Sequence, residues 1–156
     1  MGNSKERTLV LIKPDGVQRG LIGTIISRFE NVGLNIIACR FLIIDDALAG
    51  KHYAVHKGKP FYEKLTRYIT SGPVMALAVE GKGAIELVRK LVGPTDGRQA
   101  PPGTIRGDFG RDLTMNLIHA SDSPDSAEYE LALYFTGKDY ISWEYDFERW
   151  MCHAEN

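Results

Sequence analysis

Apolar positions follow two different periods in the first part of the chain. Residues 8–12 form a short, β-rich apolar run that ends at Lys13-Pro14-Asp15-Gly16, where the proline fixes one backbone angle and the glycine permits a positive one. Apolar side chains then recur at helical spacing from about residue 20 to residue 31, and Asn31 to Gly33 supply a stop signal. The pattern predicts a strand, a turn and an amphipathic helix with one buried face.

Similar patterns continue along the chain. In order, they predict a strand at 35–44, one or two short helices within 45–70, a strand at 74–79, a helix at 84–92, and a last main helix starting at Pro124 with Ser123 as N-cap. His52 and His56 fall on a helix expected at the surface, and His153 falls in the C-terminal tail. The order strand–helix–strand, strand–helix–strand predicts an α+β fold, a ferredoxin-like antiparallel sheet with helices packed on one face.

The chain length and one irregular stretch complete this picture. A chain of 156 residues can bury a single core, so we expect one domain over 1–156, with its core at about 6–150. Residues 93–110 are rich in Gly, Pro, Asp, Thr and Arg and show no period. A loop of this length inside a compact domain is usually functional or disordered.

Composition narrows the classes of function. Hydrophobic content of 44%, charged content of 25% and the lack of a long apolar run predict a soluble protein, with no membrane partner. The N-terminus lacks a secretory signal, so we expect a cytoplasmic location and read Cys39 and Cys152 as reduced thiols. A net charge of −1 gives no overall field for nucleic acid, so no nucleic-acid partner is expected, and an anionic ligand would need a local cluster of cations.

Three cations indicate where phosphate could bind. Lys13, Arg89 and Arg106 lie at the ends of predicted elements or in the long loop, although a residue of this kind taken alone is more often a solvated surface cation. The chain contains no G-x-x-x-x-G-K-[ST] motif, which excludes a Walker-type phosphate loop. Phosphates would therefore have to be held by side chains.

His119 is the candidate nucleophile among the four histidines. A neutral imidazole can attack phosphorus if one ring nitrogen is free and an acceptor holds the other. Glu130, in the helix that follows, is a candidate for this acceptor, with Ser121 as an intermediary between them. A surface glutamate on that helix is the alternative interpretation of Glu130.

The segment Asn116-x-x-His119-x-Ser121-Asp122-Ser123 resembles the active-site signature of the nucleoside diphosphate kinases. Similar segments of that family match 6–8, 12–21, 71–74 and 102–109, so the resemblance covers the chain from about residue 6 to residue 150. Ala120 departs from the family, which more often has Gly there, and a β-carbon would be costly if that position needed a positive φ. The loop 97–101 also has no residue-by-residue match.

The resemblance implies an enzyme that transfers the terminal phosphoryl group of a nucleoside triphosphate to a nucleoside diphosphate by a ping-pong route, with broad base specificity. His119 would be phosphorylated, supported by Glu130 and Ser121, and Mg²⁺ would arrive on the nucleotide without protein ligands. A homo-hexamer is implied, with a homo-tetramer as the alternative. The residues around the nucleotide would be Lys13, Tyr53, Arg89, Thr95 and Arg106 at the phosphates, Asn116 and Lys13 at the ribose, and Phe61 with Leu113 at the base. Leu65 would be a further contact of the nucleotide.

Two other classes of function stay open on the sequence alone. A non-catalytic ferredoxin-like module could keep a nucleotide pocket, although it would have no reason to keep His119, Glu130, Lys13 and Arg106 together. A nuclease or DNA-binding activity has little support, because the chain shows no clear basic stripe.

Overall fold

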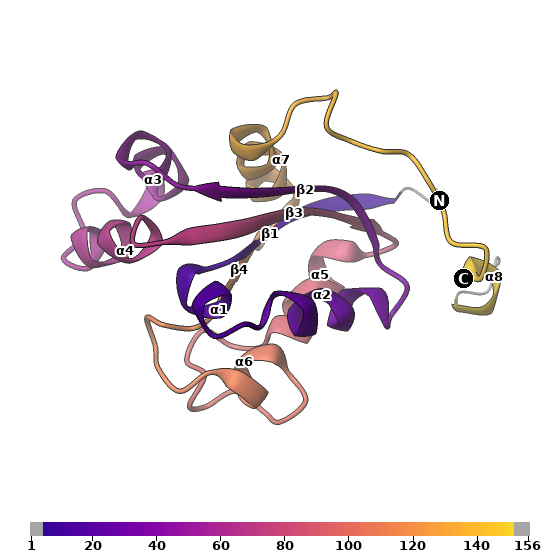
Figure 1. Ribbon diagram of the computed structural model, residues 1–156, viewed down its shortest axis with the longest axis horizontal. Coiled ribbons are helices and arrows are strands. Elements are labelled where there is room, and N and C mark those ends of the chain that lie inside the picture. Colours follow the sequence, from indigo (N-terminus) through magenta and orange to yellow (C-terminus); the bar gives the residue numbers. More distant parts are fainter. Residues whose placement is uncertain (1–4, 152–156) are drawn as a thin grey trace.

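Four antiparallel strands form one sheet in the order β2-β3-β1-β4 (Figure 1). The computed structural model describes residues 5–151, so Cys152 and His153 lie outside the described residues. The strands are β1 (Glu6–Ile12), β2 (Asn35–Ile43), β3 (Pro73–Gly81) and β4 (Ile118–Ala120). The three predicted strands are confirmed, and the fold class with them. The fourth strand, for which no range was predicted, has only three residues and pairs with β1.

Helices occupy most of the connections between the strands. They are α1 (Pro14–Gln18), α2 (Ile22–Glu30), α3 (Asp46–His52), the 3₁₀ helix η1 (Ala54–His56), α4 (Tyr62–Ile69), α5 (Ala84–Val92), α6 (Ile105–Phe109), α7 (Pro124–Tyr134) and α8 (Glu148–Met151). The predicted cap of the last main helix is confirmed, because the Ser123 side chain accepts a hydrogen bond from the Ser126 amide. In the described part of the chain, no helix has the length and apolar character needed to cross a membrane.

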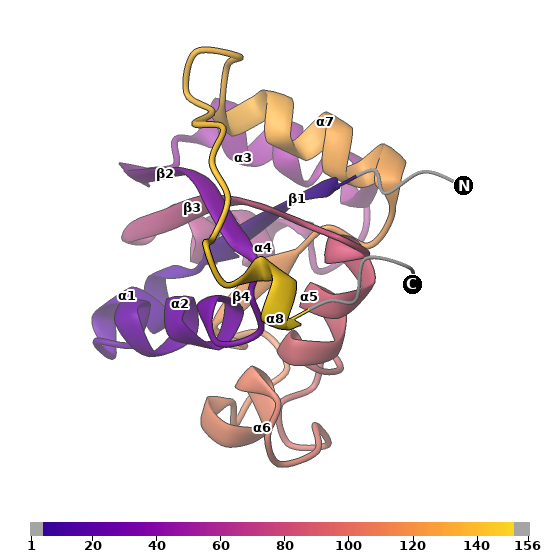
Figure 2. The same ribbon diagram turned by 90° about the vertical axis from the view of Figure 1, so that its right-hand side faces the viewer.

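Helices cover both faces of the sheet, so the prediction of helices on one face was wrong. α2 and α5 pack on one face, and α3 and α7 lie on the other, as the two views in Figures 1 and 2 show. The physical reason is visible in β1, where residues 9–12 are all buried and all apolar. A strand buried on both faces gives a continuous apolar run, whereas a half-exposed strand alternates.

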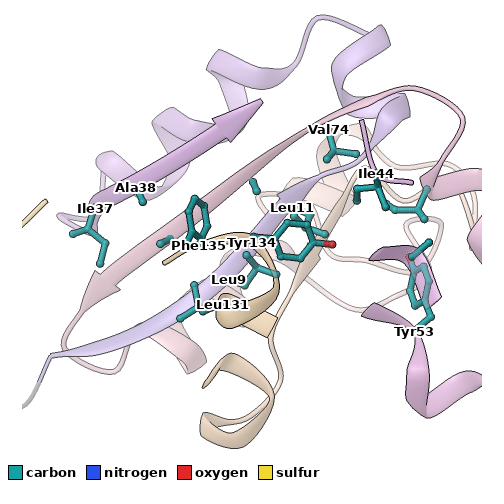
Figure 3. Packing of buried hydrophobic residues seen from close by; sticks show 14 residues of the cluster. Leu9, Leu11, Ile37, Ala38, Ile44, Tyr53, Val74, Leu131, Tyr134 and Phe135 are labelled. Carbon is teal, nitrogen blue, oxygen red and sulfur yellow. The ribbon is translucent and has the colours of Figure 1, made fainter. Parts of the chain in front are cut away.

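The core on the α3 and α7 side fixes two helices that contribute to the site. Leu9 and Leu11 of β1 pack there with Leu131 and Tyr134 of α7, close to Tyr53 at the end of α3 (Figure 3). Full burial of a large apolar side chain contributes roughly 1.5–3 kcal/mol. The helices are therefore held firmly on the sheet, and the residues adjacent to these anchors have defined positions.

The segment predicted as a turn at 13–16 is the start of the short helix α1. Pro14 occupies its first turn, where a missing N–H costs nothing, and Lys13 is the N-cap. Gly16 has no positive φ, contrary to the expectation. Glycine instead permits close packing at this position, because a β-carbon would lie 2.8 Å from Cγ2 of Ile12.

The irregular stretch 93–110 contains helix α6 and is built around a second close approach. The Thr104 side chain caps α6 by accepting a hydrogen bond from the Gly107 amide at 2.9 Å. A β-carbon on Gly107 would lie only 1.9 Å from the carbonyl oxygen of Pro101. The loop thus folds tightly back on α6, which presents Arg106 towards β4.

Candidate active site

A cavity of about 620 Å³ lies beside β4 and gathers most of the residues singled out from the sequence. Ser121 is fully buried behind it. Phe61 is not among its lining residues and is 45% exposed, with its ring centroid 5.4 Å from that of His56. The sequence-predicted residues that line the cavity are Lys13, Tyr53, Leu65, Arg89, Thr95, Arg106, Leu113, Asn116, His119 and Glu130.

The sheet topology explains why residues so distant in sequence meet here. β1 ends at Ile12, and the next residue is Lys13. β4 runs antiparallel beside β1, with His119 opposite Leu11. α7 then returns over the sheet and carries Glu130 to the same place. The site therefore depends on the pairing of the shortest strand, β4, with β1.

His119, Glu130 and Ser121 form one hydrogen-bonded group. The Nε2 atom of His119 lies 2.9 Å from Oε2 of Glu130, and the Ser121 hydroxyl donates to the same oxygen at 2.6 Å. Because a carboxylate only accepts, Nε2 carries the proton in the neutral ring. The Glu130 side chain is only 12% exposed, so it is not a surface glutamate. Ser121 is not an intermediary either, because it binds Glu130 in parallel with the histidine.

His52 packs against His119, which contradicts its predicted place on a surface helix. It is only 6% exposed, and its ring meets that of His119 edge to face with centroids 4.6 Å apart. Burial lowers the pKa of His52 well below its usual value, and the nearby His119 and Lys13 lower it further, so the ring stays neutral. The sequence contains a signal for the burial of His52. Asp45 is the N-cap of α3, and a helix that starts there places His52 and the apolar Ala49 one turn apart on the same face.

His56 is half-buried in η1 and also lines the cavity, so it too departs from the predicted surface helix. Burial lowers the pKa of His56, and the positive charge of Lys59 adds to this effect. Sequence reasoning missed this residue because the short 3₁₀ turn after α3 has no clear period.

Lys13 is a buried cation with one polar anchor. Its Nζ atom donates to Oδ1 of Asn116 at 2.8 Å, and the amide of Asn116 donates to the Thr95 carbonyl at 3.0 Å. Burial, together with the positive charge of Arg106, lowers the pKa of Lys13 to about 7. An anion in the cavity would favour the charged form of this lysine.

Arg106 is both part of the scaffold and part of the cavity wall. Its guanidinium donates to the carbonyls of Asn116, Gly93 and Ile118 at 3.2, 3.1 and 2.6 Å. Burial and the neighbouring Arg89 lower the pKa of Arg106 to about 10, so it stays charged at neutral pH. Since a guanidinium has five N–H donors, about two remain for an anionic ligand.

Leu117, two residues before His119, has a strained backbone. Its φ of 73° is the only positive value for a non-glycine residue in the described range 5–151. The amide of Ile118 donates back to the carbonyl of Asn116 at 2.9 Å, which closes a three-residue turn centred on Leu117. Such a conformation costs on the order of 1–3 kcal/mol and is found mainly at functional sites.

Ala120 needs no special backbone conformation. It lies in β4, pairs with Val10, and has no positive φ. The β-carbon that distinguishes it from glycine therefore causes no backbone strain. Its carbonyl accepts a hydrogen bond from Arg89 at 3.3 Å, so the main chain here also orients a cation of the cavity.

No group of three or more His, Cys, Asp or Glu residues that could hold a metal ion occurs within residues 5–151. Glu130 is already bound to His119 and Ser121, which leaves Asp122 as the other acidic side chain at the cavity. A cation there would fit the residues present only if its other ligands came with a substrate.

Comparisons with known proteins agree with this geometry. The family model for nucleoside diphosphate kinase matches residues 6–140. Among curated relatives, the nucleoside diphosphate kinase of Archaeoglobus fulgidus is 55% identical over 146 residues, covering 94% of this chain and 97% of that protein. That of Pyrococcus furiosus is 59% identical over 136 residues, covering 85% of this chain and 84% of that protein.

Solved structures are similar over almost the whole chain. A halophilic nucleoside diphosphate kinase from Halobacterium salinarum, in complex with CDP, superposes with a TM-score of 0.93 at 50% identity, covering 96% of this chain and 99% of that one. A nucleoside-diphosphate kinase from Borrelia burgdorferi, a transition state mimic with bound vanadate and ADP, gives 0.87 at 38% identity, covering 95% and 98%. The chain belongs to the nucleoside diphosphate kinase family.

Proposed function

We propose that this nucleoside diphosphate kinase transfers the phosphoryl group in two steps through a phosphohistidine on His119. The observation that carries the proposal is the contact between Nε2 of His119 and Glu130 at 2.9 Å. With Nε2 protonated and held, the lone pair of the ring lies on Nδ1, for which no hydrogen bond is found to any described residue. Nδ1 is therefore the proposed nucleophile.

The chemistry needs no further reactant. The Nδ1 lone pair attacks the terminal phosphorus of the triphosphate while the bond to the bridging oxygen breaks, and the diphosphate leaves with that electron pair. A second diphosphate then attacks the phosphohistidine in the same cavity and restores the imidazole. Glu130 balances the positive charge that the ring acquires in the first step. Donor and acceptor are alike, so one cavity serves both steps.

The cations of the cavity are the proposed phosphate contacts. Arg89 and Arg106 would bind phosphate oxygens by paired N–H groups, and Lys13 would add a compact charge. The Thr95 hydroxyl and the Tyr53 phenol are neutral donors; burial raises the pKa of Tyr53 to about 12, so it keeps its proton. These groups would stabilise the charge that develops on the transferred group.

The sugar and base would occupy the outer part of the cavity. Asn116 and Lys13 are joined at 2.8 Å and would face the ribose hydroxyls. Leu113 and Leu65, with the exposed ring of Phe61, would form an apolar contact for the base. The Halobacterium salinarum structure holds CDP and the Borrelia burgdorferi structure holds ADP, which supports tolerance of different bases in this chain.

Mg²⁺ is the proposed cofactor, bound through the phosphates of the nucleotide. The lining offers four cations, Lys13, Lys51, Arg89 and Arg106, and two carboxylates, so the protein itself would hold the phosphates and leave the metal to them. When bound, Mg²⁺ offsets phosphate charge and orients the oxygens of the transferred group.

We propose that the chain assembles as a homo-hexamer, with a tetramer as the alternative. Large apolar side chains are exposed on β2 and in the C-terminal segment, including Phe41 at 58%, Ile43 at 69% and Trp150 at 79%. Patches of this kind usually mark protein contacts. Sedimentation velocity at micromolar concentration should detect the oligomer, and a stable monomer would contradict it.

Labelling tests the phosphohistidine directly. After incubation with γ-labelled ATP, the protein should carry a label that is labile in acid and stable in base. His119→Ala should lose the label and about 10⁴- to 10⁶-fold in turnover. The variant should still bind ADP, because Lys13, Arg89 and Arg106 remain. Retention of a tenth of the activity would rule out the phosphohistidine route.

A further inference from the structure

Asp15 lies outside the residues assigned to the nucleotide, yet it contacts the turn that leads into His119. Its Oδ2 atom accepts a hydrogen bond from the Leu117 amide at 3.0 Å, and its Oδ1 atom accepts one from the Tyr68 hydroxyl. On the other side of the same turn, the Lys13 amide donates to the Leu117 carbonyl at 2.8 Å. Both backbone groups of Leu117 are therefore bound to the segment 13–15.

These contacts support a conformation that is unfavourable by itself. Leu117 is fully buried and has a positive φ of 73°, so its amide would have no partner if the carboxylate of Asp15 were removed. An unpartnered buried amide is costly, and a strained residue persists only where its surroundings hold it.

The turn at Leu117 also sets the position of the proposed nucleotide contacts. The Oδ1 atom of Asn116 accepts a hydrogen bond from the Lys13 side chain. The main-chain carbonyls of Asn116 and Ile118 accept hydrogen bonds from the Arg106 guanidinium. His119 follows directly in β4. A change in the turn at Leu117 would move the partners of Lys13 and Arg106 together.

We propose that Asp15 is a positioning residue, which holds Lys13 and Asn116 in place for the nucleotide by fixing the turn at Leu117. The inference rests on the proposed role of Lys13 as a phosphate contact. Asp15 should therefore have a measurable effect on nucleotide binding and turnover, although it does not line the cavity.

The charge of Asp15 supplies a second effect on Lys13. Three other side chains face this lysine. Arg106 of α6 disfavours its charged form, and the ring centroid of Tyr68 of α4 lies 5.6 Å from the Nζ atom of Lys13. The third is the neutral His52 of α3. Asp15 acts in the opposite sense to burial and to Arg106, and the pKa of Lys13 is about 7 as the result of all three. Without the carboxylate, the pKa of Lys13 should fall further, so that the lysine loses its proton at a lower pH.

The test is the pH dependence of ADP binding in Asp15→Asn and Asp15→Ser, measured by calorimetry with the full-length protein. For a pKa of Lys13 lowered by about one unit, ADP should bind about tenfold more weakly than in the wild type near pH 8 and only about twofold more weakly near pH 6. The titration of ADP itself is common to all variants and cancels in the ratio. The value of kcat/KM, which reports the free enzyme, should change in parallel with binding.

Asp45→Asn is the matched control, because it removes one carboxylate that also accepts a backbone amide, at the start of α3 and outside the lining of the cavity. Its pH profile should superpose on that of the wild type. If both Asp15 variants are folded and show the wild-type profile, or if neither variant folds, the positioning role is overturned. A wild-type enzyme that binds ADP but forms no phosphohistidine would instead contradict the proposed function and leave the binding test intact.

Discussion

His119 and Glu130 meet at 2.9 Å across the space between β4 and α7. The acceptor oxygen is also bound by Ser121, so the carboxylate has a fixed orientation. A histidine held in this way keeps one tautomer and one ring orientation, which a nucleophile requires before its substrate arrives.

Glu130→Gln should lower kcat by about ten- to hundredfold, because the neutral amide cannot balance the charge of the ring and loses a charge-assisted hydrogen bond. Glu128→Gln is the matched control on the same helix, since Glu128 is exposed and lies outside the cavity lining. Steady-state assays at saturating nucleotide measure both. A Glu130→Gln enzyme with more than half of the wild-type kcat would show that turnover does not depend on the negative charge of Glu130.

Initial rates measured against both substrates should give parallel double-reciprocal lines. This pattern is expected when the first diphosphate leaves before the second one binds, and the described residues offer one cavity with a candidate nucleophile. Exchange of label between ADP and ATP without a second nucleotide provides an independent check. Intersecting lines would instead indicate a ternary complex and direct transfer.

Acceptors that lack the 3′-hydroxyl should react more slowly than acceptors that differ in the base. Lys13 and Asn116 are 6% and 3% exposed, so loss of a hydroxyl partner would leave buried polar groups unpaired. That loss costs roughly 1–3 kcal/mol per group, or about ten- to hundredfold in kcat/KM. Leu113 and Phe61 are about half-exposed and apolar, and such a contact accepts every base. If the spread among bases exceeded the 3′-deoxy effect, both assignments would be withdrawn.

Gly107→Ala should destabilise the fold by more than about 2 kcal/mol, because its β-carbon would meet the main chain at Pro101 and not a side chain that could move. Gly23→Ala is the matched control: nothing lies within 4 Å of its β-carbon, and α2 should gain about 0.5–1 kcal/mol. Urea unfolding gives both values. A Gly107→Ala protein as stable as the wild type would mean that the loop at Pro101 shifts without cost.

Local signals in the sequence were sufficient for several elements. The helix at 84–92 matches α5 in both bounds, because its apolar period is regular and glycines flank it on either side. Ser123 and Pro124 mark the start of α7 by chemistry that acts within one turn. Elements of this kind depend on neighbours in the sequence, so a single sequence reveals them.

Contacts between distant segments were harder to predict. The N-cap Asp45 indicates that His52 shares a helix face with the buried Ala49, but not that this face packs on His119, because that contact depends on how α3 and β4 meet in the fold. Asp15 looked like part of a turn, although its two hydrogen-bond partners are 53 and 102 residues away. The positions of Lys13 and Arg106 in the sequence indicated phosphate contacts, and the role of Asn116 came from the family resemblance. The hydrogen bonds that join these three residues became visible only in three dimensions.

Three N–H groups of Arg106 donate to main-chain carbonyls, which leaves about two for the proposed contact with phosphate. Lysine, with three donors on one atom, cannot brace three carbonyls in different directions and also reach a phosphate. Substitutions at this position would therefore lose architecture and turnover together. The position of Arg106 should therefore stay unchanged in an attempt to evolve this enzyme towards a new phosphoryl acceptor, because the same side chain braces the main chain around β4.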